Sequence, residues 1–125
     1  MATTIRIIHA HDFVRATPEG HLDFGEAKRL LVEIASASAS LPECEVILDS
    51  RKARVQISVA ELWHLAGVLS ELRGEVYRKT AVLCPLEDFD KAEFFTLCAE
   101  NRGLDVRAFT SFEDAIQWLF AGSGA

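Results

Sequence analysis

The chain has 125 residues, of which half are hydrophobic, and a formal net charge of -6. This length suits one domain with a core that needs no disulfide or metal, and the acidic balance disfavours nonspecific binding to DNA or to an anionic membrane. No leader pattern opens the chain, and no apolar run approaches the ~18 residues of a membrane span. The three cysteines, Cys44, Cys84 and Cys98, lie in apolar settings and are expected to be unpaired thiols. The sequence therefore predicts a soluble cytoplasmic protein.

The chain opens with two stretches rich in β-branched residues. Residues 4–10 and 13–17 are expected to form a β-hairpin, with His11 and Asp12 in the tight turn between them. The Pro-Glu-Gly sequence at 18–20 is typical of a turn and is expected to end the second strand.

A first helix follows, with Asp23 as its N-cap. The serines in residues 35–40 compete with the backbone for hydrogen bonds, so the helix should fray there. Its buried stripe is expected to contain the apolar residues that recur at helical spacing, namely Phe24, Ala27, Leu30, Leu31 and Ile34.

The centre of the chain is a short continuous apolar run, residues 46–48, which is typical of an interior strand covered on both faces. Asp49 ends this strand, and the cations Arg51, Lys52 and Arg54 are expected in a loop beyond its carboxyl end. Ligands and partners of open α/β sheets usually bind at such strand ends. The sequence therefore directs the search for a site to this loop.

A second helix is expected from Ser58 to about residue 73, because Ser58 and Glu61 form a capping box. Its buried face is expected to contain Val59, Leu62, Trp63, Ala66 and Leu69. The remaining expected elements are a strand at 80–84, a helix at 88–100 with a left-handed cap at 101–103, a strand at 106–109 and a helix at 111–120 capped by Ser111 and Asp114.

The expected order is two strands followed by alternating helices and strands. Such alternation favours parallel strands with right-handed crossovers. We therefore predict a single α/β domain over residues 1–120, with a mostly parallel five-stranded sheet, an N-terminal hairpin and four helices, followed by a flexible tail at 121–125.

Three stretches, in this order and spacing, resemble the STAS-like, SpoIIAA-like superfamily, which includes anti-sigma-factor antagonists and bacterial proteins grouped with lipid-binding Sec14-type domains. Residues 20–23 are similar to the family's G-x-L-D entry to the first helix, and residues 46–49 to its V-x-L-D central strand. Residues 99–119 are similar to the closing strand and helix of the SpoIIAA-like branch. The resemblance implies a SpoIIAA-like fold and a non-enzymatic regulatory or binding module.

Ser58 matches the position of the serine that is phosphorylated in the family's regulated antagonists. Ile57 precedes it here instead of aspartate, and Val59, Ala60 and Glu61 follow where the family has small residues and glycine. Three interpretations of Ser58 stay open: a helix cap, a phosphorylation site, or part of an anion site formed with the cationic loop.

The candidate contact surface is the edge formed by Asp49, Arg51, Arg54, Ser58 and the loop from Cys84 to Asp88. A solvated loop, with Arg51 paired to Asp49, is the simpler interpretation of the cations. Cys84 is interpreted as a buried thiol, although a helix N-terminus could activate it.

Two further clusters have simple and functional interpretations. His9 and His11, near His21, are ordinary surface histidines or the start of a metal site. The third helix has a wide apolar face around Phe94 and Phe95, which indicates either packing between sheet and helix or a homodimer interface.

The leading hypothesis is a non-catalytic cytoplasmic module that binds a protein partner and needs no metal or cofactor. The alternative is a carrier of a small anionic or lipid-like ligand, with a cavity lined by Phe24, Trp63 or Phe95. An enzyme is the third hypothesis, since neither a nucleophile–base pair nor a ligand cluster is visible in the sequence.

Overall fold

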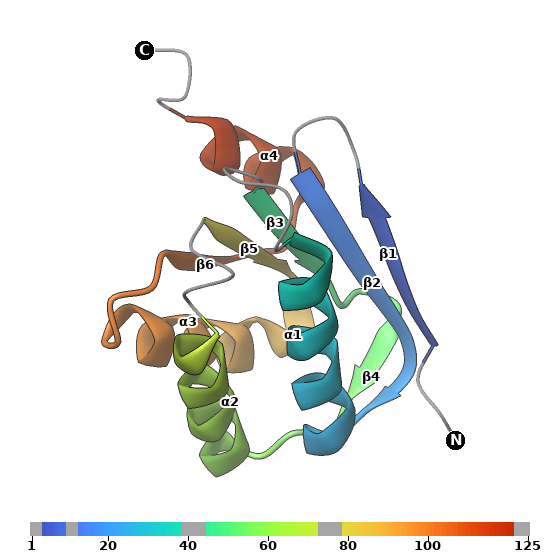
Figure 1. Cartoon of the computed structure of the whole chain (residues 1–125), viewed down its shortest axis with the longest axis vertical. Helices are drawn as coiled ribbons and strands as arrows, with labels where there is room; N and C mark the ends of the chain where they lie inside the picture. The colour runs from blue at the N-terminus through green and yellow to red at the C-terminus, as the bar shows by residue number, and fades with distance from the viewer. Residues whose placement is uncertain (1–3, 10–12, 39–44, 73–78, 122–125) are drawn as a thin grey trace.

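The computed structural model describes residues 4–9, 13–38, 45–72 and 79–121. Five strands form one sheet in the order β1-β2-β3-β5-β6, and a short strand, β4, pairs with β2 beyond the end of β3 (Figure 1). The strands are β1 (Thr4–His9), β2 (Phe13–Leu22), β3 (Glu45–Asp49), β4 (Ala53–Val55), β5 (Thr80–Leu83) and β6 (Val106–Phe109). The helices are α1 (Phe24–Ser38), α2 (Val59–Glu71), α3 (Phe89–Glu100) and α4 (Phe112–Phe120), with a short 3-10 turn at Leu86–Asp88.

The sheet has the predicted topology. β1 is antiparallel to β2, whereas β2, β3, β5 and β6 pair in parallel. β3 lies between β2 and β5, so the apolar run is an interior strand as predicted. The predicted fold class is therefore confirmed. None of the helices in the described ranges is long and apolar enough to cross a bilayer.

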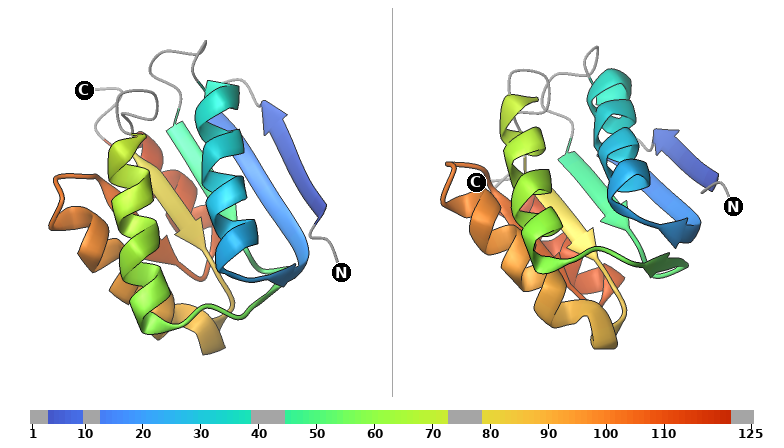
Figure 2. Two further views of the ribbon diagram at one scale, coloured as in Figure 1. Left: turned by 60° about the horizontal axis from the view of Figure 1, so that its bottom comes forward. Right: turned by 90° about the horizontal axis from the view of Figure 1, so that it is seen from below.

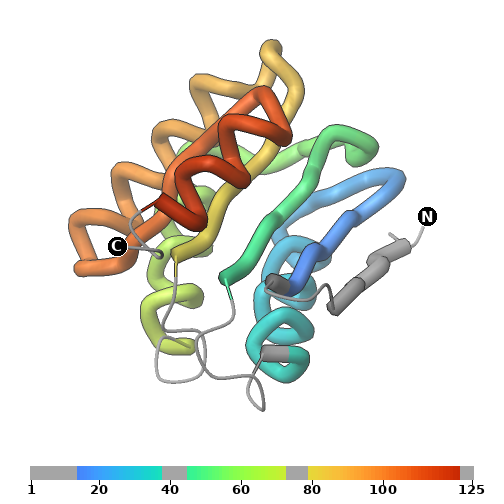
Figure 3. The backbone as a smooth tube through the Cα atoms, turned by 90° about the horizontal axis from the view of Figure 1, so that it is seen from above, coloured from blue at the N-terminus to red at the C-terminus, as the bar shows by residue number. Residues whose placement is uncertain are grey.

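The helices cover the two faces of the sheet unequally. The main core contains Val46 and Leu48 of β3 together with buried residues of α1, α2 and α3. Ile47, which points to the opposite face, packs with Ala115 and Leu119 of α4. Figure 3 shows α4 on the side of the strands opposite α1 and α2. The period-two alternation along β3 thus assigns neighbouring residues to different cores.

The prediction that β2 ends at residue 17 is wrong. β2 continues through Pro18 and Gly20 to Leu22, paired with β1 as far as Glu19. Its parallel neighbour changes in this stretch: β3 pairs with β2 up to Ala16 and β4 pairs from Gly20. Pro18 lies in the gap between the two parallel ladders, where its missing N–H costs no ladder bond on that side. Gly20 has a φ of 94°, a backbone conformation that glycine adopts without strain.

The loop predicted after Asp49 contains a strand that the sequence did not indicate. Arg54 lies in β4, opposite His21 of β2 in the ladder. Three residues are too few for a periodic signal, and their partner strand lies about thirty positions earlier, so only the tertiary fold creates this pairing.

The first two helices begin where predicted. Asp23 caps α1, since its carboxylate accepts a hydrogen bond from the Glu26 N–H at 2.9 Å, and α1 continues to Ser38 with Ala35 buried. The capping box of α2 is present as well, with the Ser58 hydroxyl accepting from the Glu61 N–H at 3.2 Å.

The buried face of α2 is partly different from the prediction. Leu62, Ala66 and Leu69 are buried as expected, together with Leu65, but Val59 and Trp63 are exposed. The buried residues of α2 lie at positions 62, 65, 66 and 69, and position 63 falls outside this stripe of the helix. Trp63 instead packs on the surface, 4.8 Å from the guanidinium of Arg102.

The ends of α3 and α4 follow the sequence signals closely. Gly103 has a φ of 82°, and the N–H of Leu104 donates to the Ala99 carbonyl at 3.0 Å, which is the predicted left-handed cap. Ser111 caps α4 by accepting from the Asp114 N–H at 3.4 Å. The predicted tail falls almost wholly on 122–125, outside the described residues, as do Cys44 and the hairpin turn at 10–12.

Candidate functional site

The carboxyl ends of the parallel strands gather most of the predicted site residues at one edge of the molecule. Asp49 is the last residue of β3 and Cys84 directly follows β5. Ser58 and Asp88 directly precede α2 and α3. Figure 2 shows the tips of β3 and β5 beside the first turns of these two helices.

Asp49 is a buried carboxylate held by two arginines. Its side chain is 3% exposed, and Arg15 of β2 donates to Oδ2 from Nη2 at 2.7 Å. Arg51 donates to Oδ1 from Nε at 2.9 Å and to Oδ2 from Nη2 at 3.0 Å, and its backbone N–H reaches Oδ1 at 3.2 Å. The guanidinium of Arg15 also lies 5.3 Å from the ring centre of Phe112 in α4. This cluster therefore ties β2, the turn after β3 and α4 together.

Two opposing effects determine the pKa of Asp49. Burial alone would raise the pKa, but hydrogen bonds from Arg51 and Arg15 outweigh it and hold the pKa below its usual value. The same contact raises the pKa of Arg51, although burial works against this rise. The simpler interpretation of Arg51, pairing with Asp49, is the arrangement found.

Arg54 and Ser58 belong to other elements than Arg51, which lies in the turn after β3. Arg51 pairs with Asp49, whose other partner, Arg15, lies against Phe112 of α4, whereas Ser58 begins α2 on the opposite face of the sheet (Figure 3). The Ser58 hydroxyl is used in the capping box, and its N–H donates to Glu61 Oε1 at 2.9 Å. Arg54 is exposed in β4. A single anion receptor formed by these groups stays a prediction.

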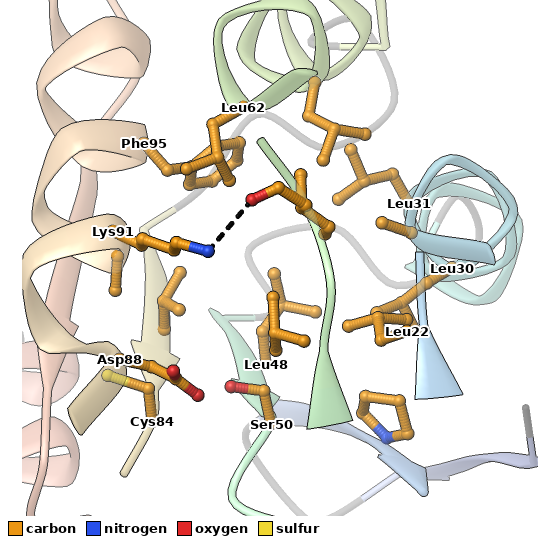
Figure 4. A pocket seen from close by; sticks show the side chains of 17 residues that line it. Leu22, Leu30, Leu31, Leu48, Ser50, Leu62, Cys84, Asp88, Lys91 and Phe95 are labelled. Atoms are coloured by element: carbon orange, nitrogen blue, oxygen red, sulfur yellow. Dashed lines mark hydrogen bonds between the residues drawn. The ribbon is translucent and has the colours of Figure 1, made fainter. Parts of the chain in front are cut away.

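A cavity of about 100 Å³ opens at the same edge, between the sheet and helices α1, α2 and α3 (Figure 4). Its wall is almost entirely aliphatic and aromatic, and six of its lining residues are Leu22, Leu30, Leu31, Leu48, Leu62 and Phe95. Of the three aromatic residues expected to line a carrier cavity, Phe95 does so, whereas Phe24 and Trp63 do not.

Three of the residues around this cavity are polar, although the lining surface itself is apolar. Ser50, Asp88 and Lys91 line it, and Lys91 Nζ donates a hydrogen bond to the Ile57 carbonyl at 3.2 Å. The Ser50 hydroxyl donates to the Leu83 carbonyl at 3.1 Å. Sequence reasoning found Asp88 but missed Ser50 and Lys91. Lys91 follows Asp88 by three residues on one helical face, a spacing that could have indicated it.

Cys84 also lines the cavity and is fully buried. Burial, with smaller contributions from the carboxylates of Asp88 and Glu87, raises the pKa of this thiol to about 11. At neutral pH it is therefore protonated, and the protonated form is a poor nucleophile. Cys98 is a free thiol in the main core.

The two remaining predictions concern histidines and the third helix. His11 and the side chain of His9 lie outside the described residues, and across the described ranges no three His, Cys, Asp or Glu residues gather as metal ligands would. Phe95 is only 7% exposed and packs in the main core, so the wide apolar face of α3 serves partly to fill the core; Leu97 remains exposed.

No family model and no curated protein sequence matches the chain. Several solved structures are similar to it over nearly its whole length. An uncharacterised DUF3478-family protein with a SpoIIAA-like fold from Shewanella loihica PV-4 is 19% identical, with a TM-score of 0.60 over 94% of this chain and 93% of that one.

Two anti-sigma factor antagonists are similar as well. The protein from Mycobacterium paratuberculosis is 15% identical, with a TM-score of 0.63 over 94% of each chain. SpoIIAA in its unphosphorylated form is 16% identical, with a TM-score of 0.54 over 96% of this chain and 99% of that one. The order of strands, the hairpin and the four helices described above, together with these three similarities, show that this chain has a SpoIIAA-like fold.

Proposed function

We propose that the chain is a non-catalytic regulatory module that works in the cytoplasm by binding another protein at the carboxyl edge of its sheet. The observation that carries this proposal is the exposure of Leu86, 77% of whose surface is open to water in the turn between β5 and α3. An exposed apolar patch rimmed by polar residues is typical of a contact surface, and Leu86 would form such a patch together with exposed Val59 of α2.

Other residues at this edge support the same proposal. Val59, in the first turn of α2, is 56% exposed. The hydrogen bond from Lys91 to the Ile57 carbonyl holds the start of α2 close to the first turn of α3. Lys52 and Arg54 are exposed cations at the same end of the sheet. We expect a partner that offers an apolar anchor and acidic residues. Two of the similar structures are anti-sigma factor antagonists, which agrees with a regulatory role.

The test is capture of partners by the tagged full-length chain, quantified by mass spectrometry. Leu86→Asp should reduce the capture of a true partner by roughly tenfold or more, because loss of a central anchor is that costly. Val32→Asp is the matched control, since Val32 is an exposed aliphatic residue on α1. Lys52→Glu with Arg54→Glu should weaken capture in a salt-dependent way. If wild type, Leu86→Asp and Val32→Asp capture the same proteins equally, this edge is not the contact surface.

A homodimer through α3 could not use Phe95 as the sequence suggested. Since Phe95 packs in the core, such a dimer would use half-buried Phe94 with exposed Leu97.

The cavity supports a second candidate function, the binding of a small ligand with an apolar part. Its volume of about 100 Å³ is too small for a long acyl chain as the structure stands. The lipid-like ligand of the sequence analysis would therefore have to displace a helix, whereas a compact ligand would not.

A further inference from the structure

We infer that the cavity binds a free aliphatic α-amino acid with a branched side chain, of the size of leucine. The inference names the ligand class for the second candidate function and rests on it. The ligand's side chain fills the apolar interior, and its two charged groups meet the two opposite charges at the mouth.

The interior selects a small branched hydrocarbon. In another protein a cavity of roughly 150 Å³ with similar lining holds benzene, a molecule of six carbon atoms. By that measure the about 100 Å³ present here suits a four-carbon side chain. The leucines and Phe95 around it offer no hydrogen-bond partner, so a polar side chain would be penalised.

The mouth selects a zwitterion. Figure 4 shows the amino end of Lys91, from α3, and the carboxylate of Asp88, from the turn before α3, both directed toward the cavity. Lys91 Nζ uses one of its three donors on the Ile57 carbonyl, which leaves two for a ligand carboxylate. Among the described residues the Asp88 carboxylate has neither a hydrogen-bond donor nor an ion-pair partner, so it can accept from a ligand ammonium.

The start of α2 adds to the preference for a carboxylate beside Lys91. The contact between Lys91 and the Ile57 carbonyl brings this ammonium close to the N-terminus of α2, where the helix dipole favours negative charge. A ligand with a carboxylate alone would leave Asp88 unpaired and next to a like charge. A ligand with an amine alone would leave Lys91 unpaired. A molecule that carries both groups satisfies both side chains, and an α-amino acid is the smallest such molecule.

The test is a calorimetric and NMR titration of the full-length chain with L-leucine. Three analogues serve as comparison: isocaproate lacks the ammonium, isopentylamine lacks the carboxylate, and glycine lacks the side chain. We expect saturable binding of leucine with amide shifts at Leu48, Leu62 and Phe95. Each analogue should bind weaker by roughly tenfold or more, because each loses a charge-assisted contact or the buried side chain.

Variants separate the ligand class from the general carrier function. Lys91→Met and Asp88→Asn should each weaken leucine binding by roughly tenfold. Lys28→Met, at an exposed position on α1, should not change it. Ala92→Leu should fill the cavity from α3 and abolish binding; the two charge variants keep the test valid if this variant folds poorly.

Two results would overturn the inference in different ways. If isocaproate binds as tightly as leucine, or if neither charge variant changes leucine binding, the amino-acid class is wrong while a small-ligand carrier survives. If no compound of the series binds, the carrier function fails too. Neither result bears on the proposal that a protein partner binds at Leu86, which the capture experiment tests separately.

Discussion

At the scale of single residues, Asp49 decides how the carboxyl edge is organised. Its carboxylate accepts hydrogen bonds from Arg15 and Arg51 while being almost fully buried. The sequence placed Asp49 at the end of an interior strand and suggested Arg51 as its partner. It could not reveal Arg15, which lies 34 positions earlier and reaches Asp49 only because β2 and β3 pair in parallel.

We predict that Asp49→Asn lowers the free energy of unfolding by about 2 kcal/mol at neutral pH. The loss is smaller than for a fully buried ion pair because the side chains of Arg15 and Arg51 are 33% and 40% exposed. Thermal and urea unfolding measure this change. Asp105→Asn, at an exposed position before β6, is the control and should change stability little.

The same substitution has a defined pH dependence. Because the pKa of Asp49 is lower in the folded protein than in the unfolded chain, its stabilising contribution is present above the ordinary aspartate pKa of about 3.9. The contribution is lost as the pH falls through the lower, folded pKa. The stability difference between wild type and Asp49→Asn should therefore shrink in strongly acidic buffer. If the stability difference between wild type and Asp49→Asn stays constant down to the pH of acid unfolding, the Asp49 charge does not stabilise the fold.

At the scale of the elements, helix ends were the most predictable features. Asp23, Ser58 and Ser111 each cap the helix that the sequence assigned to them, because a cap is a contact over three residues and needs no distant partner. Strand ends were less predictable. β2 continues through Pro18 and Gly20 because its neighbours provide pairing, a fact that no local turn signal contains.

Two glycine substitutions in the helical layer should have opposite signs. Gly103→Ala, at a φ of 82° in the cap of α3, should destabilise the protein by about 1 kcal/mol. Gly67→Ala should stabilise it by roughly 0.5–1 kcal/mol, because helix propensity improves. A Cβ on Gly67 would lie 3.8 Å from Nη2 of Arg102, which is an ordinary contact distance. Denaturant unfolding of both variants checks the prediction, and equal signs would refute it.

At the scale of the whole molecule, the sheet separates two cores of unequal size. Three helices bury Val46 and Leu48 on one face, while α4 covers Ile47 on the other. The smaller core depends on few side chains. Truncating one buried side chain of this smaller core should therefore remove a large share of the contacts that hold α4 on the sheet.

Leu119→Ala should lower the free energy of unfolding by about 3 kcal/mol, because Leu119 is 2% exposed and its loss leaves a cavity beneath α4. Leu97→Ala is the matched control, since the same atoms are removed from an exposed site on α3. We expect its effect to be within about 0.5 kcal/mol. Similar losses for both variants in urea unfolding would show that α4 does not form a separate core.

The sequence by itself determined the local features: the helix caps, the left-handed turn at Gly103, the interior strand ending at Asp49 and the order of elements that leads to a parallel sheet. Each of these depends on residues a few positions apart. The tertiary structure alone decided which side chains meet: Arg15 with Asp49, β4 with β2, and Lys91 with the Ile57 carbonyl at the mouth of an apolar cavity. These contacts join residues about thirty positions apart, and they exist only once the strands have paired and three helices have packed on one face of the sheet.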